Sequence, residues 1–170
     1  MGNRPLENLE KYLEEWILRL DEPQEFYQGS RCPFAKSAWN NNRAKVVKSF
    51  HPDINVFWAT VAEECENFNQ EFDIIIVVSN SIYDIQNIDS AVDALNIYLN
   101  TQNKDLWLLQ SCNDLYSMVF IQKITALDDA SKILERTPYY DKMRPDVFDK
   151  LIIYRRILRN NLQGNKNESK

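Results

Sequence analysis

The stretch Phe72-Asp73-Ile74-Ile75-Ile76-Val77-Val78-Ser79 decides the fold. It is a run of β-branched residues that is apolar at both odd and even positions, so both faces of the extended chain must be covered. The stretch therefore predicts a central β-strand over 72–79, with other elements packed on each side of the sheet.

Amphipathic segments flank this strand. Apolar residues recur at steps of three and four over 53–69 and 88–99, which predicts a helix on each side. Asp53 or His51 is the expected N-cap of the first helix. Further out, the patterns predict helices at 5–20, 126–135 and 145–160. They also predict strands at 43–50, 106–112 and 116–123, with a tight turn at Asn113-Asp114 between the last two.

This order of elements indicates an α/β (α+β) protein. Strand–helix–strand units favour parallel neighbours, and the late hairpin adds an antiparallel strand. We therefore expect a mixed four-stranded sheet with helices packed on it, in a ferredoxin-like or closely related layout. Residues 1–162 should form a single domain, and the tail 163–170, which has no apolar residue, should be disordered.

Composition and charge exclude several functional classes. The net charge is −5, with +5 on residues 142–170 and −10 on the remainder, and an acidic body argues against nucleic-acid binding. Only 3 glycines are present, and no phosphate-binding glycine loop occurs. No apolar run approaches the roughly 20 residues of a membrane span, and no signal-peptide core follows Met1, so the cytoplasm is expected.

The cysteines are odd in number and widely spaced, so they predict neither a disulfide framework nor a paired metal site. Cys65 lies on the apolar stripe of the 53–69 helix and is expected in the core, and Cys112 ends a strand. Cys32 differs, because it directly precedes Pro33 and a short helical segment. Unpaired N–H groups at a helix start, together with Arg31 or Lys36, favour the thiolate form.

A histidine and a group of cations with a neighbouring tyrosine are further candidate site residues. His51 is the only histidine and would be the simplest general base for Cys32, although a surface cap is an equal alternative. Arg31, Lys36, Arg43 and Arg136, with Tyr139 beside the last, are predicted to bind an anionic substrate, whereas the competing interpretation is solvated surface charge.

The motif Cys32-Pro33-Phe34-Ala35-Lys36, which follows a helix containing Trp16, resembles the opening of a bacterial family known as domain of unknown function 1415. The resemblance continues along most of the chain as a similar order of strands and helices. It implies the fold more than an activity, because the family has no established one. This chain departs from the family in its short Asn113-Asp114 turn, where family members carry a longer loop with a His-Pro pair. Here His51-Pro52 falls earlier.

Cys32-Pro33-Phe34-Ala35 is also similar to the active-site start of omega-class glutathione transferases. We reject this resemblance on architecture, because residues 22–31 do not form a convincing strand and no room is left for the large helical second domain.

Two functional hypotheses follow. In the first, the chain is a small cytoplasmic enzyme in which Cys32 and His51 act on a small anionic metabolite. In the second, it is a non-catalytic binding or accessory protein in a biosynthetic pathway. The expected partner is a small-molecule ligand or a partner protein, with a homodimer as an open alternative and with no nucleic acid or membrane. The cofactor is unknown, and a haem bound at Cys32-Pro33 is a third alternative.

Overall fold

The computed structural model describes residues 9–18, 33–112 and 116–167. The first part of the chain supplies two helices and one strand, α1 (Leu9–Leu18), α2 (Pro33–Asn40) and β1 (Ala44–Lys48). Then follow α3 (Ile54–Glu66), β2 (Ile74–Ser79), α4 (Ile85–Thr101), β3 (Trp107–Cys112) and β4 (Ser117–Gln122). The last elements are α5 (Ile124–Leu134), η3 (Pro138–Tyr140), α6 (Pro145–Phe148), η4 (Asp149–Ile153) and α7 (Tyr154–Asn167).

The four strands form one mixed sheet, as the sequence predicts, and their order in the sheet is β1-β2-β4-β3. β1 and β2 are parallel, whereas β4 is antiparallel to both β2 and β3. All residues of β2 and β4 are buried, which confirms 72–79 as the source of a central strand. From β1 onward the chain order is βαβαββα, which differs from the βαββαβ order of ferredoxin-like proteins. The layout is therefore a related α+β arrangement.

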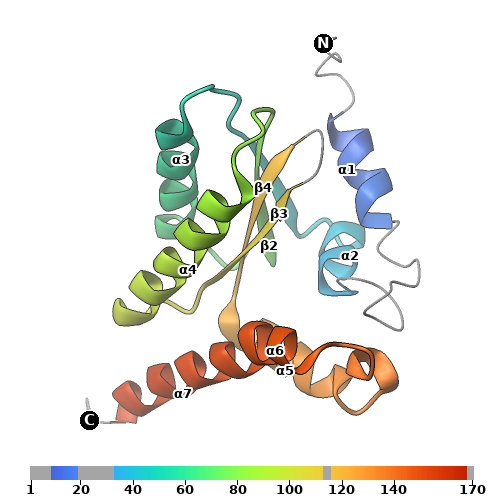
Figure 1. Ribbon diagram of the computed structural model, residues 1–170, viewed down its shortest axis with the longest axis vertical. Helices are drawn as coiled ribbons and strands as arrows, with labels where there is room; N and C mark the ends of the chain where they lie inside the picture. Colours follow the sequence, from blue (N-terminus) through green and yellow to red (C-terminus); the bar gives the residue numbers. More distant parts are fainter. Residues whose placement is uncertain (1–8, 19–32, 113–115, 168–170) are drawn as a thin grey trace.

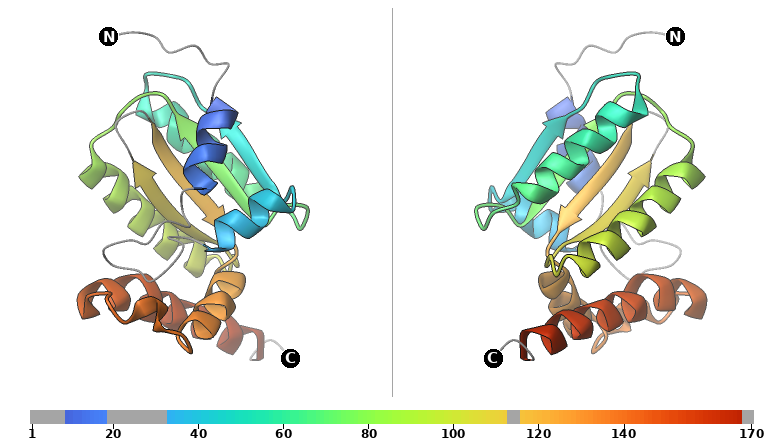
Figure 2. Two further views of the ribbon diagram at one scale, coloured as in Figure 1. Left: turned by 90° about the vertical axis from the view of Figure 1, so that its right-hand side faces the viewer. Right: turned by 90° about the vertical axis from the view of Figure 1, so that its left-hand side faces the viewer.

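Helices cover both faces of the sheet, as Figure 1 and Figure 2 show. Alternation along β2 divides its side chains between two apolar cores. Ile75 and Val77 face the core shared with α3 and α4, which includes Phe57 and Leu108. Ile74, Ile76 and Val78 belong to the core shared with α1 and α2.

The helices that follow β4 lie at one end of the sheet (Figure 1). Because β4 is antiparallel to β2, its last residue, Gln122, pairs with Ile74 at the start of β2. α5 therefore leaves the sheet at the amino ends of β1 and β2. A smaller core of Trp107, Ile124, Leu127 and Leu158 joins this helical layer to the sheet.

Several boundaries differ from the predictions for physical reasons. α4 begins at Ile85, before the predicted 88, because the side chain of Asp84 accepts the N–H groups of Gln86 and Asn87. α7 continues to Asn167, into the segment 163–170 that the sequence predicts to be disordered. Extending a formed helix needs no new nucleus, so polar residues can continue it. The turn at 113–115 lies outside the described residues.

No helix in the described parts of the chain is long and apolar enough to cross a membrane.

Candidate binding cleft at the edge of the sheet

His51 lies at the carboxyl ends of β1 and β2, where it takes part in a helix cap. Its Nδ1 accepts the N–H of Asp53 at 3.1 Å, and Asp53 caps α3 through the N–H of Asn55. The carbonyl oxygen of His51 accepts the hydroxyl of Tyr83 at 3.1 Å. The imidazole therefore helps to shape the β1–α3 turn, while the N-cap of α3 is Asp53.

The predicted cation Arg43 precedes β1, at the opposite end of that strand from His51. Its guanidinium donates two hydrogen bonds to the carboxylate of Asp73, at 2.9 and 2.8 Å, and a third to the carbonyl of Gln70. The hydrogen bonds to Asp73 raise the pKa of Arg43. Its described partners are thus groups of the α3–β2 connection.

The other predicted site residues are placed as follows. Arg136 is exposed, and its main-chain N–H closes the end of α5 by donating to the carbonyl of Ile133. Tyr139 is buried, and its ring packs edge-on against Tyr140 with the centroids 4.8 Å apart. Lys36 is half-buried on α2. Arg31 and Cys32 lie outside the described residues, so the predicted Cys32–His51 pair stays a prediction.

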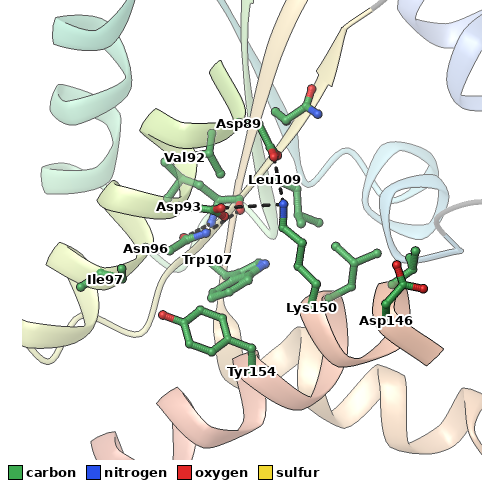
Figure 3. A pocket seen from close by; sticks show the side chains of 14 residues that line it. Asp89, Val92, Asp93, Asn96, Ile97, Trp107, Leu109, Asp146, Lys150 and Tyr154 are labelled. Carbon is green, nitrogen blue, oxygen red and sulfur yellow. Dashed lines mark hydrogen bonds and ion pairs between the residues drawn. The ribbon is translucent and has the colours of Figure 1, made fainter. Parts of the chain in front are cut away.

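The structure contains a different candidate site that sequence reasoning missed. A cleft of about 440 Å³ opens where the edge strand β3 meets α4 and the segment from α6 to α7 (Figure 3). Its lining comes from residues 89–97, 107–110 and 146–154. This volume lies within the range of roughly 300–1,000 Å³ that is usual for small-molecule sites.

A π-helical turn forms one wall of the cleft. η4 (Asp149–Ile153) interrupts the helix between α6 and α7, and it carries Lys150 and Leu151. Val147 and Tyr154, which lie just before and just after the turn, also line the cleft. Single π turns inside α-helices occur often at functional sites, because the extra residue turns side chains away from the regular helical face.

The opposite wall is acidic. Asp89 and Asp93 lie one turn apart on α4, and Lys150 reaches both of them from η4 (Figure 3). The distance from Lys150 Nζ to Asp89 Oδ2 is 2.9 Å, and the distance to Asp93 Oδ2 is 3.7 Å. The hydrogen bond to Asp89 raises the pKa of Lys150. A third carboxylate in the lining, Asp146, is paired with Arg144.

Asn96 holds the edge strand in place at the floor. Its side chain is buried, donates to the carbonyl of Leu108 at 3.0 Å and accepts the N–H of Leu108 at 2.8 Å. These are main-chain groups that point away from β4, so Asn96 supplies the two hydrogen bonds that a further strand would make.

Two residues of the lining each carry a buried polar atom that lacks a partner among the described residues. These atoms are the indole Nε1 of Trp107, a residue with only 4% of its surface exposed, and the side-chain Oε1 of Gln110. Trp107 packs against Tyr154 with the ring centroids 6.2 Å apart. Most buried polar atoms in proteins are hydrogen-bonded, so two unpartnered ones on residues that line a single cleft call for an explanation.

No group of three acidic, histidine or cysteine side chains in the described parts of the chain is arranged to hold a metal ion. The residues that line the cleft include carboxylates, a lysine, an aromatic pair and two side chains with an unpartnered polar atom, and this set suits recognition of an organic ligand.

Known proteins give no further guide. No family model, curated protein or solved structure matches this chain. The likeness to domain of unknown function 1415 therefore remains a prediction from the Cys32-Pro33-Phe34-Ala35-Lys36 motif.

Some signals of the cleft were present in the sequence. Asn96 falls within the apolar stripe of its helix, beside Leu95 and Leu99, and a polar residue there indicates a buried hydrogen bond. The spacing of Val147, Lys150, Leu151 and Tyr154 is that of an ordinary helical face, so it conceals the π turn.

Proposed function

We propose that this protein binds a small organic molecule in the cleft between α4, β3 and the α6–η4–α7 segment. The observation that carries the proposal is that two residues lining a single cleft each carry a buried polar atom without a partner among the described residues, Trp107 Nε1 and Gln110 Oε1. A ligand with one acceptor and one donor would satisfy both atoms once the side chains that cover them move aside, and it would remove the free-energy cost of leaving them unpaired, about 1–3 kcal/mol for each.

The composition of the walls supports this proposal. Trp107 and Tyr154 provide aromatic surface, while the aliphatic parts of Val92, Ile97 and Leu151 provide apolar contact. A few polar groups on a mainly apolar surface are typical of small-molecule sites, where the polar groups fix the orientation of the ligand. This is the non-catalytic alternative of the sequence analysis, and its expected location is the cytoplasm.

A cleft-filling substitution tests the proposal. Ile97 lines the cleft and is 51% exposed, so Ile97→Trp should fill the cleft without disturbing the core. Amide chemical-shift mapping with a library of small polar compounds should show shifts at residues 89–97, 107–110 and 146–154 in the wild type, and these shifts should be lost in the variant.

The matched control is Ile133→Trp, since Ile133 is 65% exposed on α5 and lies outside the cleft. It should bind like the wild type. If no compound shifts the cleft residues, or if Ile97→Trp binds as well as the wild type, the proposed function is wrong.

A reactive-cysteine enzyme is the second candidate. One observation favours it: α2 begins at Pro33, the residue directly after Cys32. The free N–H groups of a helix start stabilise a thiolate. In this proposal, Cys32 attacks a small anionic substrate.

The alkylation rate of each cysteine against pH tests this candidate, with peptide mass spectrometry to separate the sites. Cys65 is the internal control, because burial raises the pKa of its thiol to about 12. Cys32 should react with an apparent pKa well below the ~8.5 of a free thiol, while Cys65 stays inert in the folded protein. Equal inertness of Cys32 would remove the thiol hypothesis.

A further inference from the structure

Lys150 spans the cleft from one wall to the other. It starts on η4 and ends between Asp89 and Asp93 on α4, so a single side chain joins the C-terminal helices to α4 (Figure 3). All three side chains are about half exposed. Ion pairs in such surroundings contribute about 0–1 kcal/mol, so a competing cation can displace the lysine at little cost.

The carboxylates outnumber the cation at this point. Asp89 and Asp93 are separated by four residues on α4, and like charges at that spacing repel each other. Lys150 lies 2.9 Å from the first and 3.7 Å from the second, so the contact with Asp93 is the longer one. The wall keeps an attraction for positive charge even with Lys150 in place.

Trp107 provides an independent sign of a ligand. Trp107 is only 4% exposed, and its Nε1–H has no acceptor among the described residues. Figure 3 shows the indole with its nitrogen turned toward Lys150. A group that replaces Lys150 across the cleft would therefore come close to this donor.

We propose that the ligand is a primary ammonium ion carried on a short apolar chain, and that its nitrogen takes the place of Lys150 Nζ between Asp89 and Asp93. This inference rests on the proposed function of the cleft. The apolar chain lies along Trp107 and Tyr154, as the lysine methylenes do along apolar surfaces generally. A hydrogen-bond acceptor farther along the ligand receives the Trp107 Nε1–H.

The positions of the Asp89 and Asp93 carboxylates favour a primary ammonium over other organic cations. A primary ammonium is a compact charge with three N–H donors, which suits two carboxylate oxygens that approach one nitrogen from the same side. A quaternary ammonium has no donor to give to either carboxylate. A guanidinium is flat, and it pairs best with both oxygens of one carboxylate.

The test uses the free analogue of the lysine side chain, n-butylammonium, as the probe. Lys150→Met keeps an apolar stem but removes the competing cation. We expect the variant to bind n-butylammonium about two- to fivefold more tightly than the wild type, which is the fold-change that corresponds to an exposed ion pair. Affinity is measured by amide chemical-shift titration of the full chain, with tetramethylammonium as the non-donating comparison.

Lys142→Met is the matched control, because Lys142 is exposed and lies outside the cleft. It should bind n-butylammonium like the wild type, and Asp89→Asn with Asp93→Asn should weaken binding at least fivefold. A probe whose affinity for Lys150→Met is unchanged or lower would overturn this inference.

The two proposals fail in different ways. If butanoate or another anion binds in the cleft and Lys150→Met weakens that binding, the cleft is a binding site but the proposed ligand class is wrong. If neither cations nor anions shift the cleft residues, the proposed function itself is wrong.

Discussion

The carboxylate of Asp128 shows how single residues hold the C-terminal helices together. It is 1% exposed and accepts hydrogen bonds from Arg156 at 2.8 Å and from Arg159, and Lys132 lies 3.1 Å away. Burial alone would raise the pKa of Asp128. The hydrogen bonds from Arg159, Arg156 and Lys132 outweigh that effect and lower the pKa to about 2. The chain therefore joins α5 to α7 through a charged group that stays ionised.

Replacing Asp128 with asparagine should lower the free energy of unfolding by about 3 kcal/mol at pH 7, because a neutral amide cannot replace the charge-assisted hydrogen bonds that the buried carboxylate accepts from Arg156 and Arg159. The folded-state pKa is below the ordinary carboxyl value of 3.8, so the stabilisation is complete above that value and is lost as the pH falls toward 2. The difference between wild type and Asp128→Asn should therefore narrow over this range. Urea unfolding at several pH values measures it.

Asp129→Asn is the control for this substitution. Asp129 also pairs with Arg159, but it is 63% exposed, and exposed pairs contribute less than about 1 kcal/mol. A loss at Asp129 as large as that at Asp128, or a difference at Asp128 that does not change with pH, would contradict the argument.

For single residues, burial could be predicted from the sequence more readily than the side chain with which a residue pairs. The stripe position of Cys65 predicts its burial, and the structure confirms it. The sequence predicts that Arg43 belongs to an anion site, whereas in the structure Arg43 pairs with Asp73, which is 30 positions away and lies in the expected central strand segment. Contacts between residues that far apart depend on the strand order, which no local pattern encodes.

At the scale of elements, most helices and strands could be predicted because their apolar periodicities differ clearly. The strand 72–79 and the helix 53–69 are the best examples, and the structure places β2 and α3 within them. The π turn η4 could not be predicted, because Val147, Leu151 and Tyr154 follow one another at steps of four and three residues, as apolar residues on an ordinary α-helix do. The cleft was missed for that reason, because η4 turns Lys150 toward α4.

The edge strand β3 shows a second element whose role depends on tertiary contacts. Its sequence indicates a strand, but only the structure reveals that Asn96 occupies the outward-facing hydrogen-bonding groups of Leu108. Open sheet edges invite pairing with other chains, and proteins commonly cover or block them. α4 thus has two roles, since it covers one end of this edge and supplies the acidic wall of the cleft.

At the scale of the whole molecule, β2 is shared by two cores that lie on opposite faces of the sheet. Ile75 is 2% exposed in the core with α3 and α4, and its neighbour Ile76 is fully buried in the core with α1 and α2. The hydrogen bonds that join β2 to β1 and β4 support both faces of the sheet. If the sheet unfolds under one helical layer, the core on the other face is therefore exposed as well. We therefore expect the two layers to unfold together.

The substitutions Ile75→Ala and Ile76→Ala form a matched pair that tests this expectation, because they remove the same atoms from adjacent residues on opposite faces. Each should lower the free energy of unfolding by about 2–5 kcal/mol, from lost burial and the cavity left behind. Each should also shift a single unfolding transition, seen alike by tryptophan fluorescence and by far-ultraviolet circular dichroism, with an unchanged dependence on denaturant. If Ile76→Ala instead produces a separate early transition while Ile75→Ala does not, the α1–α2 layer unfolds independently and the shared strand does not couple the two cores.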